Sequence, residues 1–315
     1  MNRFEPQARL PKPEELVNTL EFEEVAKQVL PAPAFATVAG SDRSPFDRIT
    51  LRPRLLTPTL DMDLGVELFG QTLFTPIIAG PVADQRRYHA EGELATARGC
   101  AAARTIMIVS SRSSVPLAEI AGQAAQAKTP LWFSTFADAN ARRSIADAVA
   151  AGCKVAIITV GISEQGSQPR PAPIDWKAVD EARRGAPVPV VLKGVTTPQQ
   201  AKTAVDAGLQ GIVVSDYQKA PMEALPSIVD VCGDRVPVLV DGSFRRGSDT
   251  AMALALGARG VLVARPLMWG LAAYGDTGVQ AVLDLMQSDL GRTMGALGAS
   301  TIKSLDRNFV RVHRR

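Results

Sequence analysis

Eight short segments of mostly apolar residues recur along the chain from residue 75 onward. Each is rich in Val, Ile or Leu, and successive segments begin 23 to 33 residues apart. Nearly continuous apolar runs of this length are typical of strands covered on both faces, as in a parallel sheet. The predicted strands are TPIIAG (75–80), TIMIVSS (105–111), LWFSTF (131–136), VAIITV (155–160), VPVVLKG (188–194), GIVVSD (211–216), VPVLVDG (236–242) and GVLVARP (260–266).

The segments between these strands carry the signals of helices. Thr197 and Pro198 provide a cap and a first-turn proline before QQAKTAVDA, and Gly208 ends that segment. The alanine-rich stretch 139–151 ends in the same way at Gly152. Strand and helix alternate eight times, so the sequence predicts an α/β fold, a (β/α)8 TIM barrel.

The remaining residues flank this predicted barrel, which occupies 75–302. Residues 1–74 are expected to form an N-terminal extension that packs on the barrel. It should contain a helix around Leu16–Val29 and a small hairpin within Leu51–Leu73. Residues 303–315 form a basic C-terminal tail. No composition change marks a linker to a second domain.

Most of the predicted strands end on a small or polar residue that breaks the apolar pattern. Barrel enzymes carry their chemistry at the carboxyl ends of the strands, so these residues predict the site. The ordinary polarity of loops could account for some of these residues. It accounts less well for a lysine and an aspartate that both end buried strands. The strand-end residues are Gly80, Ser110, Ser111, Ser134, Thr159, Lys193, Ser215, Asp241 and Arg265.

Two motifs after the last strands predict a phosphate site. DGSFRRGSD (241–249) follows the seventh strand and ARP (264–266) follows the eighth. Phosphates in such barrels bind between these two loops, beside a helix N-terminus. Gly242 allows close backbone approach, Ser243 offers a hydroxyl, and arginine forks match phosphate oxygens. Arg245 and Arg265 supply the forks, unless the motif is only a surface turn with solvated arginines.

The stretches 191–216 and 236–286 resemble the FMN-dependent α-hydroxy acid dehydrogenase family, which includes the glycolate and lactate oxidases. EFEEVAKQVLP (21–31), FDRITLRPRLL (46–56) and HAEGELATARGCAAARTIMIVSS (89–111) agree as well. The resemblance covers nearly the whole chain. It implies an FMN-binding barrel that assembles as a homo-oligomer, a tetramer or octamer.

The resemblance implies a flavin site at the strand ends. The turn Gly80-Pro81-Val82 would lie against the isoalloxazine ring, and Ser110 and Thr159 would hydrogen-bond its polar edge. Lys193 matches a lysine that faces the N1–O2 region, where a cation favours the reduced, anionic flavin. The other implied contacts are Ser134, where the family has glutamine, Ser215 on the ribityl side, Asp241, which matches the aspartate of the family's DGG turn, and Gly242, Ser243, Arg245, Ala264 and Arg265 around the phosphate.

The substrate side departs from the family pattern. The sixth strand of the family ends S-N-H-G-G-R, whose histidine takes the substrate proton and whose arginine holds its carboxylate. Here Tyr217 stands in place of the histidine and Ala220 in place of the arginine. A phenol is a poor base near neutral pH. Tyr217 is a candidate catalytic residue as a proton donor, but it could also stack on the flavin or fill vacated space.

Further substitutions fall on the same side. Phe136 replaces a tyrosine of the third strand, and Gly161 replaces the aspartate that orients the histidine. The second carboxylate-binding arginine falls near Gln168, in a shortened loop, and the N-terminal substrate tyrosine falls near Thr37. Lys219 restores only part of the lost positive charge. These substitutions argue against ordinary oxidation of 2-hydroxy acids.

Three hypotheses follow from this contrast. The first is a flavin-dependent oxidoreductase with altered substrate chemistry, with Lys193 and Tyr217 as catalytic candidates; an isomerase that uses reduced flavin is one version of it. The second is a non-catalytic FMN-binding protein, a structural or sensory partner. The third drops the flavin and gives Lys193 a Schiff-base role, as in barrel aldolases.

Charge and composition limit the partners and the cellular compartment that are expected for this protein. The formal net charge is +3, of which the tail from Lys303 onward contributes +4, so the body is near neutral and unsuited to nucleic acid. No apolar run reaches the length of a membrane span, and no secretory leader opens the chain. Three dispersed cysteines predict neither disulfides nor a metal site. A cytoplasmic protein with an unidentified small-molecule substrate is expected.

Overall fold

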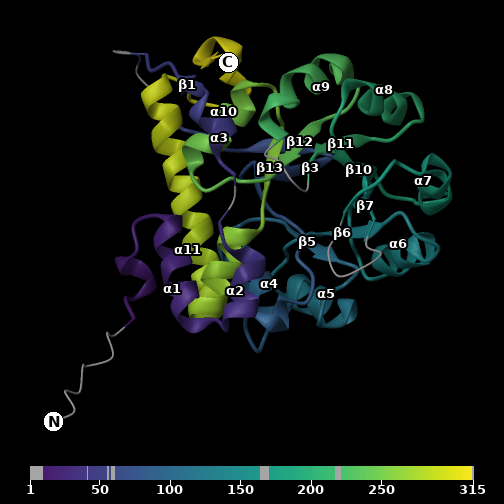
Figure 1. The fold of residues 1–315 in the computed structure, drawn as a ribbon, viewed down its shortest axis with the longest axis horizontal. Coiled ribbons are helices and arrows are strands. Elements are labelled where there is room, and N and C mark those ends of the chain that lie inside the picture. Colours follow the sequence, from purple (N-terminus) through teal and green to yellow (C-terminus); the bar gives the residue numbers. More distant parts are fainter. Residues whose placement is uncertain are drawn as a thin grey trace.

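The computed structural model describes residues 10–40, 42–54, 57, 61–163, 170–216 and 221–313. Eight parallel strands form a closed barrel in which the last strand pairs with the first (Figure 1). This confirms the predicted TIM barrel, and each strand lies within its predicted segment except β10, which continues one residue further, to Val195. The strands are β4 (Ile77–Ala79), β5 (Met107–Ser110), β6 (Leu131–Phe136), β7 (Ala156–Thr159), β10 (Val190–Val195), β11 (Gly211–Val214), β12 (Val238–Asp241) and β13 (Gly260–Val263).

A helix follows each barrel strand, as the alternating pattern predicts. The signals at Thr197 act as expected: its hydroxyl accepts a hydrogen bond from Gln200 N at 3.3 Å, and Pro198 opens the helix. The helices are α4 (Glu93–Ala102), α5 (Leu117–Gln126), α6 (Ala141–Ala150), α7 (Trp176–Arg183), α8 (Pro198–Asp206), α9 (Leu225–Cys232), α10 (Gly247–Ala255) and α11 (Arg265–Leu297). No helix in the described ranges is long and apolar enough to cross a lipid bilayer.

The N-terminal extension begins with short helices, and its α1 packs beside α11 (Figure 1). Its first α-helix begins at Thr19 because the Asn18 side chain caps it, accepting from Leu20 N and Glu21 N. The extension contains a 3-10 turn (Pro13–Glu15), α1 (Thr19–Val29), α2 (Ala32–Val38), α3 (Ser44–Asp47), β1 (Ile49–Leu51) and the hairpin strands β2 (Val66–Leu68) and β3 (Gln71–Leu73).

The C-terminal segment returns to this extension. Its strand β14 (Val310–Val312) pairs antiparallel with β1, and His313 N donates to Arg48 O at 2.8 Å. The basic tail is therefore held against the body through residue 313. The remaining short elements are β8 (Ile162–Ser163), β9 (Arg170–Pro171) and the 3-10 turns Gln85–Arg87, Pro221–Glu223, Ile302–Ser304 and Arg307–Phe309.

The barrel interior is filled by one apolar side chain from each strand, and the β2–β3 hairpin closes its amino-terminal end. Phe69 of the hairpin packs edge-on against Trp132 at 5.3 Å between ring centroids, and Trp132 Nε1 donates to Gln71 Oε1 at 3.3 Å. Only the carboxyl end of the barrel is left for a ligand. The interior residues are Ile78, Ile108, Trp132, Ile157, Val191, Val213, Leu239 and Leu262.

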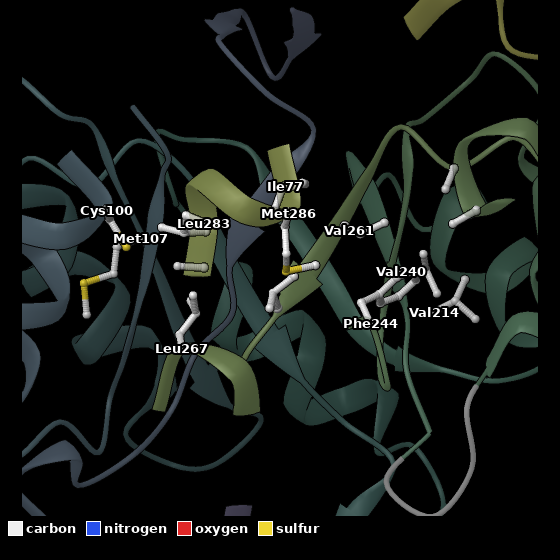
Figure 2. Packing of buried hydrophobic residues seen from close by; sticks show 14 of the residues in the cluster. Ile77, Cys100, Met107, Val214, Val240, Phe244, Val261, Leu267, Leu283 and Met286 are labelled. Carbon is white, nitrogen blue, oxygen red and sulfur yellow. The ribbon is translucent and has the colours of Figure 1, made fainter. Parts of the chain in front are cut away.

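A second cluster joins the outer faces of the strands to the helices. Figure 2 shows members of this cluster from the barrel strands, among them Ile77 and Val261, together with Leu283 and Met286 of α11. Because successive side chains of a strand point to opposite faces, the same strands supply both clusters. The barrel is thus covered on both faces, as the continuous apolar runs predict.

Helix α11 turns back on itself at Gly275, whose φ is +63°. This brings Gly270 against Gly278, where a Cβ would lie 2.0 Å from the Gly270 carbonyl oxygen. Gly278→Ala is expected to lower the free energy of unfolding by about 2–3 kcal/mol, because overpacking forces the backbone apart. Urea unfolding measures the change.

Gly291→Ala is the matched control in the same helix. A Cβ at Gly291 would meet nothing within 4 Å. Alanine is the better helix former, so this variant should be as stable as the parent chain or more stable, by up to about 1 kcal/mol. Equal effects of the two substitutions would contradict the close contact at Gly278.

Candidate active site

A polar layer covers the apolar interior at the carboxyl end of the barrel. Side chains two positions apart on a strand share a face, so the residue two places after each interior residue also points inward. This alternation explains why the strand-end residues predicted from the sequence come together. The layer consists of Gly80, Ser110, Ser134, Thr159, Lys193, Ser215, Asp241 and Ala264.

Lys193 lies at the centre of the most strongly bonded group in this layer. Its Nζ is 2.7 Å from Asp241 Oδ2 and donates to Ser215 Oγ at 3.0 Å, while Ser215 Oγ donates to Asp241 at 3.3 Å. The three residues stand on the adjacent strands β10, β11 and β12. The Lys193 side chain is 14% exposed, so its charge is kept near Asp241 and largely away from bulk water.

The backbone after Lys193 requires glycine. Gly194 has a φ of +109°, and a Cβ there would lie 2.1 Å from the Val160 carbonyl oxygen. Strand β10 can therefore pass close to the end of β7 while Lys193 continues to face the barrel axis. A larger residue would separate these strands and move the ammonium group.

Ser110, Ser134 and Thr159 form a more buried part of the layer. Ser134 Oγ and Thr159 Oγ1 are 3.3 Å apart, and Ser110 Oγ accepts from Arg112 N at 3.2 Å. All three are buried residues on the consecutive strands β5, β6 and β7. Their hydroxyls can either donate or accept, which suits a ligand edge that carries both kinds of group.

The predicted phosphate loop lies where β12 meets α10. Gly242 and Ser243 both have positive φ values, +120° and +65°. Beyond this turn, Arg245 Nη2 and Arg265 Nη1 donate to the same carbonyl oxygen, that of Gly40, at 3.3 and 2.7 Å. Two arginines from separate loops are thus brought to one point, as the two motifs predict.

The place where these two arginines meet is electropositive, because two guanidinium cations lie close together there. Arg245 is 3% exposed, and its burial, followed by the nearby positive charge of Arg265, lowers its pKa to about 10. Arg43 lowers the pKa further, while Glu23 and Asp249 oppose it. Cations held this close to one another favour an anion between them, and a phosphate matches the guanidinium forks.

An ion pair from the N-terminal extension braces the phosphate loop. The Arg43 guanidinium makes two hydrogen bonds to the Asp249 carboxylate, both at 2.9 Å, and a third to the Ser243 carbonyl at 2.7 Å. Asp249 also accepts from the backbone N–H groups of Arg245 and Arg246, at 2.8 and 2.9 Å. Arg43 was not among the predicted site residues, because nothing in SDRSP (41–45) signals a contact with residue 249.

A cavity of about 360 Å³ opens above this layer, a size typical of small-ligand sites. Of the predicted site residues it is lined by Pro81, Val82, Lys193, Ser215, Asp241, Gly242, Ser243, Arg245, Ala264 and Arg265. The predicted residues Gly80, Ser110, Ser134 and Thr159 are not part of that lining. Thr37, Asp42 and Tyr88 line the cavity and were not predicted to bind the cofactor.

Part of the predicted substrate side lies outside the described residues: Gln168, Tyr217, Lys219 and Ala220. The other three substituted positions, Thr37, Phe136 and Gly161, are described, and Thr37 lines the cavity. The Arg112 guanidinium lies over the Phe136 ring, 4.4 Å from its centroid. Gly161 has a φ of +78°, so an aspartate there would be strained.

Both histidines of the chain are described, and neither lines the cavity. His89 lies beside Gly275, and its Nδ1 accepts from Glu91 N at 3.3 Å. His313 Nε2 is 2.9 Å from Thr50 Oγ1, next to the β1–β14 pair. The cavity therefore contains no imidazole.

Comparison with known proteins gives a consistent result. The model of the family described as FMN-dependent dehydrogenase matches residues 35–173 and 162–312. A peroxisomal (S)-2-hydroxyacid oxidase of Arabidopsis thaliana is 33% identical over 95% of this chain and 97% of its own length. The L-lactate oxidase of Nostoc sp. is 32% identical over 93% and 98%. A crystal structure of mandelate oxidase superposes with a TM-score of 0.86, at 32% identity, over 95% of this chain and all of that one.

The residues present also fit FMN on structural grounds. Paired guanidiniums at the loop after β12 suit its phosphate, the Lys193–Ser215–Asp241 group offers donors and acceptors for a polyol, and the buried hydroxyls suit a polar ring edge. The alignment with the Arabidopsis relative spans 353 positions, so that protein has segments that this 315-residue chain lacks. The predicted resemblance is confirmed, and with it FMN as the cofactor of the group: the chain belongs to the FMN-dependent dehydrogenase family.

Proposed function

We propose that the chain is an FMN-dependent oxidoreductase whose substrate chemistry differs from the oxidation of 2-hydroxy acids. The observation that carries this proposal is the composition of the cavity. Its cation-rich end and its lysine–aspartate pair suit a flavin nucleotide, whereas both histidines of the chain lie elsewhere. The residues that suit the cofactor are present, whereas the cavity lacks the histidine that is the family's usual proton acceptor.

The residues divide by position. Arg245 and Arg265 bind the phosphate, Ser215 and Asp241 contact the ribityl chain, and Lys193 faces the flavin ring. Ser110, Ser134 and Thr159 bind the polar edge of the ring. Bound FMN supplies a two-electron acceptor or donor at the carboxyl end of the barrel. The hydrogen-bond donors that line the cavity support the binding of FMN.

The absence of an imidazole from the cavity is expected to slow the oxidation of hydroxy acids. A positioned general base typically contributes about 10²–10⁴-fold to the rate. Tyr217 takes the place of that base in the sequence, and we assign it a proton-donor or stacking role. Membership of a flavin family and the ion pair of Lys193 with Asp241 argue against the Schiff-base hypothesis.

The first experiment is the visible spectrum of the purified protein after FMN addition and desalting. We expect a retained flavin band that dithionite bleaches. Anaerobic mixing with glycolate, L-lactate or mandelate should then reduce the flavin at least about 100-fold more slowly than it reduces a relative that has the histidine. A colourless protein would refute FMN binding, and rapid reduction by a hydroxy acid would refute altered chemistry.

The same experiment tests the alternative of a non-catalytic FMN-binding protein. The absence of an imidazole from the cavity favours that alternative equally. A flavin that dithionite reduces, but that no alcohol, amine, thiol or nicotinamide donor reduces with turnover, would support passive binding. Reduction by any of these donors with repeated turnover would support the enzyme.

We also propose a cytoplasmic homo-oligomer that acts on a small molecule. Apolar side chains are exposed at Leu20 and Val29 of the first α-helix and at Val17 just before it, which suits a contact between subunits. All three cysteines are buried and free of disulfides, as expected in a reducing compartment. Analytical ultracentrifugation would give the subunit number, and a monomer at micromolar concentration would contradict the oligomer.

A further inference from the structure

A hydrogen bond between two distant segments borders the outer part of the cavity. Thr37 lies in the last turn of the N-terminal helix α2, and Tyr88 lies in the loop between β4 and α4. Thr37 Oγ1 and the Tyr88 hydroxyl are 2.8 Å apart, and both residues line the cavity. The pair is thus placed to contact a ligand in this cavity.

The direction of this hydrogen bond follows from a count of protons. A threonine hydroxyl has one proton, and Thr37 Oγ1 donates it to the Ala34 carbonyl oxygen at 2.7 Å, which can only accept. Thr37 must therefore accept from Tyr88, whose single proton is used in that bond. The Tyr88 oxygen can then offer a ligand only a lone pair, so it presents an acceptor to the cavity.

The charges around the cavity act in the same direction. Its described lining holds three cations, Lys193, Arg245 and Arg265, and three carboxylates, Asp42, Asp216 and Asp241. A phosphate monoester brings about 1.5 to 2 negative charges. With FMN bound, this lining has an excess of negative charge, which opposes a second anion.

We propose that the substrate is a neutral or cationic molecule, an alcohol or an amine, that donates a hydrogen bond to the Tyr88 oxygen and has no carboxylate. Tyr88 is the substrate-binding residue, and Thr37 is a positioning residue that fixes the direction of its proton. This inference rests on the proposed function and adds the substrate class. The proposed substrate differs from a carboxylate in its charge and in the hydrogen-bond donor that it offers to the Tyr88 oxygen.

Three probes of nearly equal shape test the proposal: 2-phenylethylamine as its ammonium ion, 2-phenylethanol, and phenylacetate. Isothermal titration calorimetry with FMN-loaded protein measures binding without turnover. We expect the ammonium and the alcohol to bind at least about 10-fold more tightly than phenylacetate, since like charge and a missing donor both penalise the carboxylate. Tighter binding of phenylacetate would overturn the proposal.

Two variants separate the acceptor role from simple packing. Tyr88→Phe should weaken binding of the ammonium and the alcohol about 2- to 10-fold and leave phenylacetate unchanged. Thr37→Val removes the acceptor of the Tyr88 proton, so the hydroxyl can donate again and phenylacetate binding should improve. Tyr274→Phe is the control, because its hydroxyl donates to Pro11 O at 2.5 Å outside the cavity lining.

The outcomes distinguish this inference from the proposed function. The same titrations are run on FMN-free protein, where Tyr88→Phe should have the same effect on the ammonium. Loss of FMN with the probe preference intact would refute the proposed function alone. A retained flavin with equal binding of all probes, or a Thr37→Val variant that leaves phenylacetate unchanged, would refute the role of the Thr37–Tyr88 pair.

Discussion

Arg265→Leu is expected to weaken FMN binding about 10- to 150-fold, the effect of losing about 1.5–3 kcal/mol from a hydrogen bond to a charged group. Arg265 opens α11, and its guanidinium meets that of Arg245 at the Gly40 carbonyl. Replacing Arg265 removes one of the two guanidinium groups that are proposed to bind the phosphate, and it leaves the barrel intact. Fluorescence titration of the FMN-free protein measures the dissociation constant.

Arg265 is expected to contact only the phosphate of FMN, so riboflavin is the informative comparison. Riboflavin has the same ring and ribityl chain without the phosphate, and its affinity should be the same in both proteins. The salt dependence of FMN binding should also fall in the variant, because one of the interacting charges is gone. Arg265→Lys keeps the charge but loses the fork, and it should bind FMN with intermediate affinity.

Arg259→Leu controls for loss of a surface arginine. Arg259 is exposed at the amino-terminal end of β13, on the opposite side of the barrel. Its substitution should leave the FMN affinity unchanged. An equal loss in both variants would mean that long-range charge, not contact at the phosphate loop, governs binding. Loss of riboflavin binding in Arg265→Leu would point instead to a disturbed fold.

The strand-end chemistry could be predicted from the sequence because local rules determine it. An apolar run of a few residues followed by Lys193 or Asp241 gives both the strand and the side that its last residue faces. The Lys193–Asp241 contact at 2.7 Å then follows from two strands that each end in the same layer. The paired arginines are predictable in the same way, since the two loops adjoin in any closed barrel.

The contacts made by the N-terminal extension could not be predicted. Arg43 reaches Asp249 across 206 positions, and Thr37 reaches Tyr88 across 51. Both involve short irregular segments, where periodicity carries no information about the partner. The direction of the Tyr88 proton follows only from the structure, because the Ala34 carbonyl takes the proton of Thr37.

Asp249→Ala is expected to lower the free energy of unfolding by about 3–5 kcal/mol, the usual cost of removing one partner of a buried ion pair. The Asp249 side chain is 4% exposed, and it accepts four hydrogen bonds, two from Arg43 and two from backbone N–H groups at the start of α10. Alanine has no side-chain acceptor for these four hydrogen bonds. Urea unfolding, with the denaturant slope unchanged, gives the loss.

A double-mutant cycle with Arg43 shows how much of this loss belongs to the pair. Arg43 is 28% exposed, so water solvates it partly once Asp249 is gone. Arg43→Met in the Asp249→Ala background should therefore cost much less than it costs alone, which gives a coupling of about 1–3 kcal/mol. Strictly additive losses would show that Asp249 acts only on the backbone of the phosphate loop. Since Arg43 also binds the Ser243 carbonyl, coupling would mean that the N-terminal extension helps to hold the phosphate loop in its binding conformation.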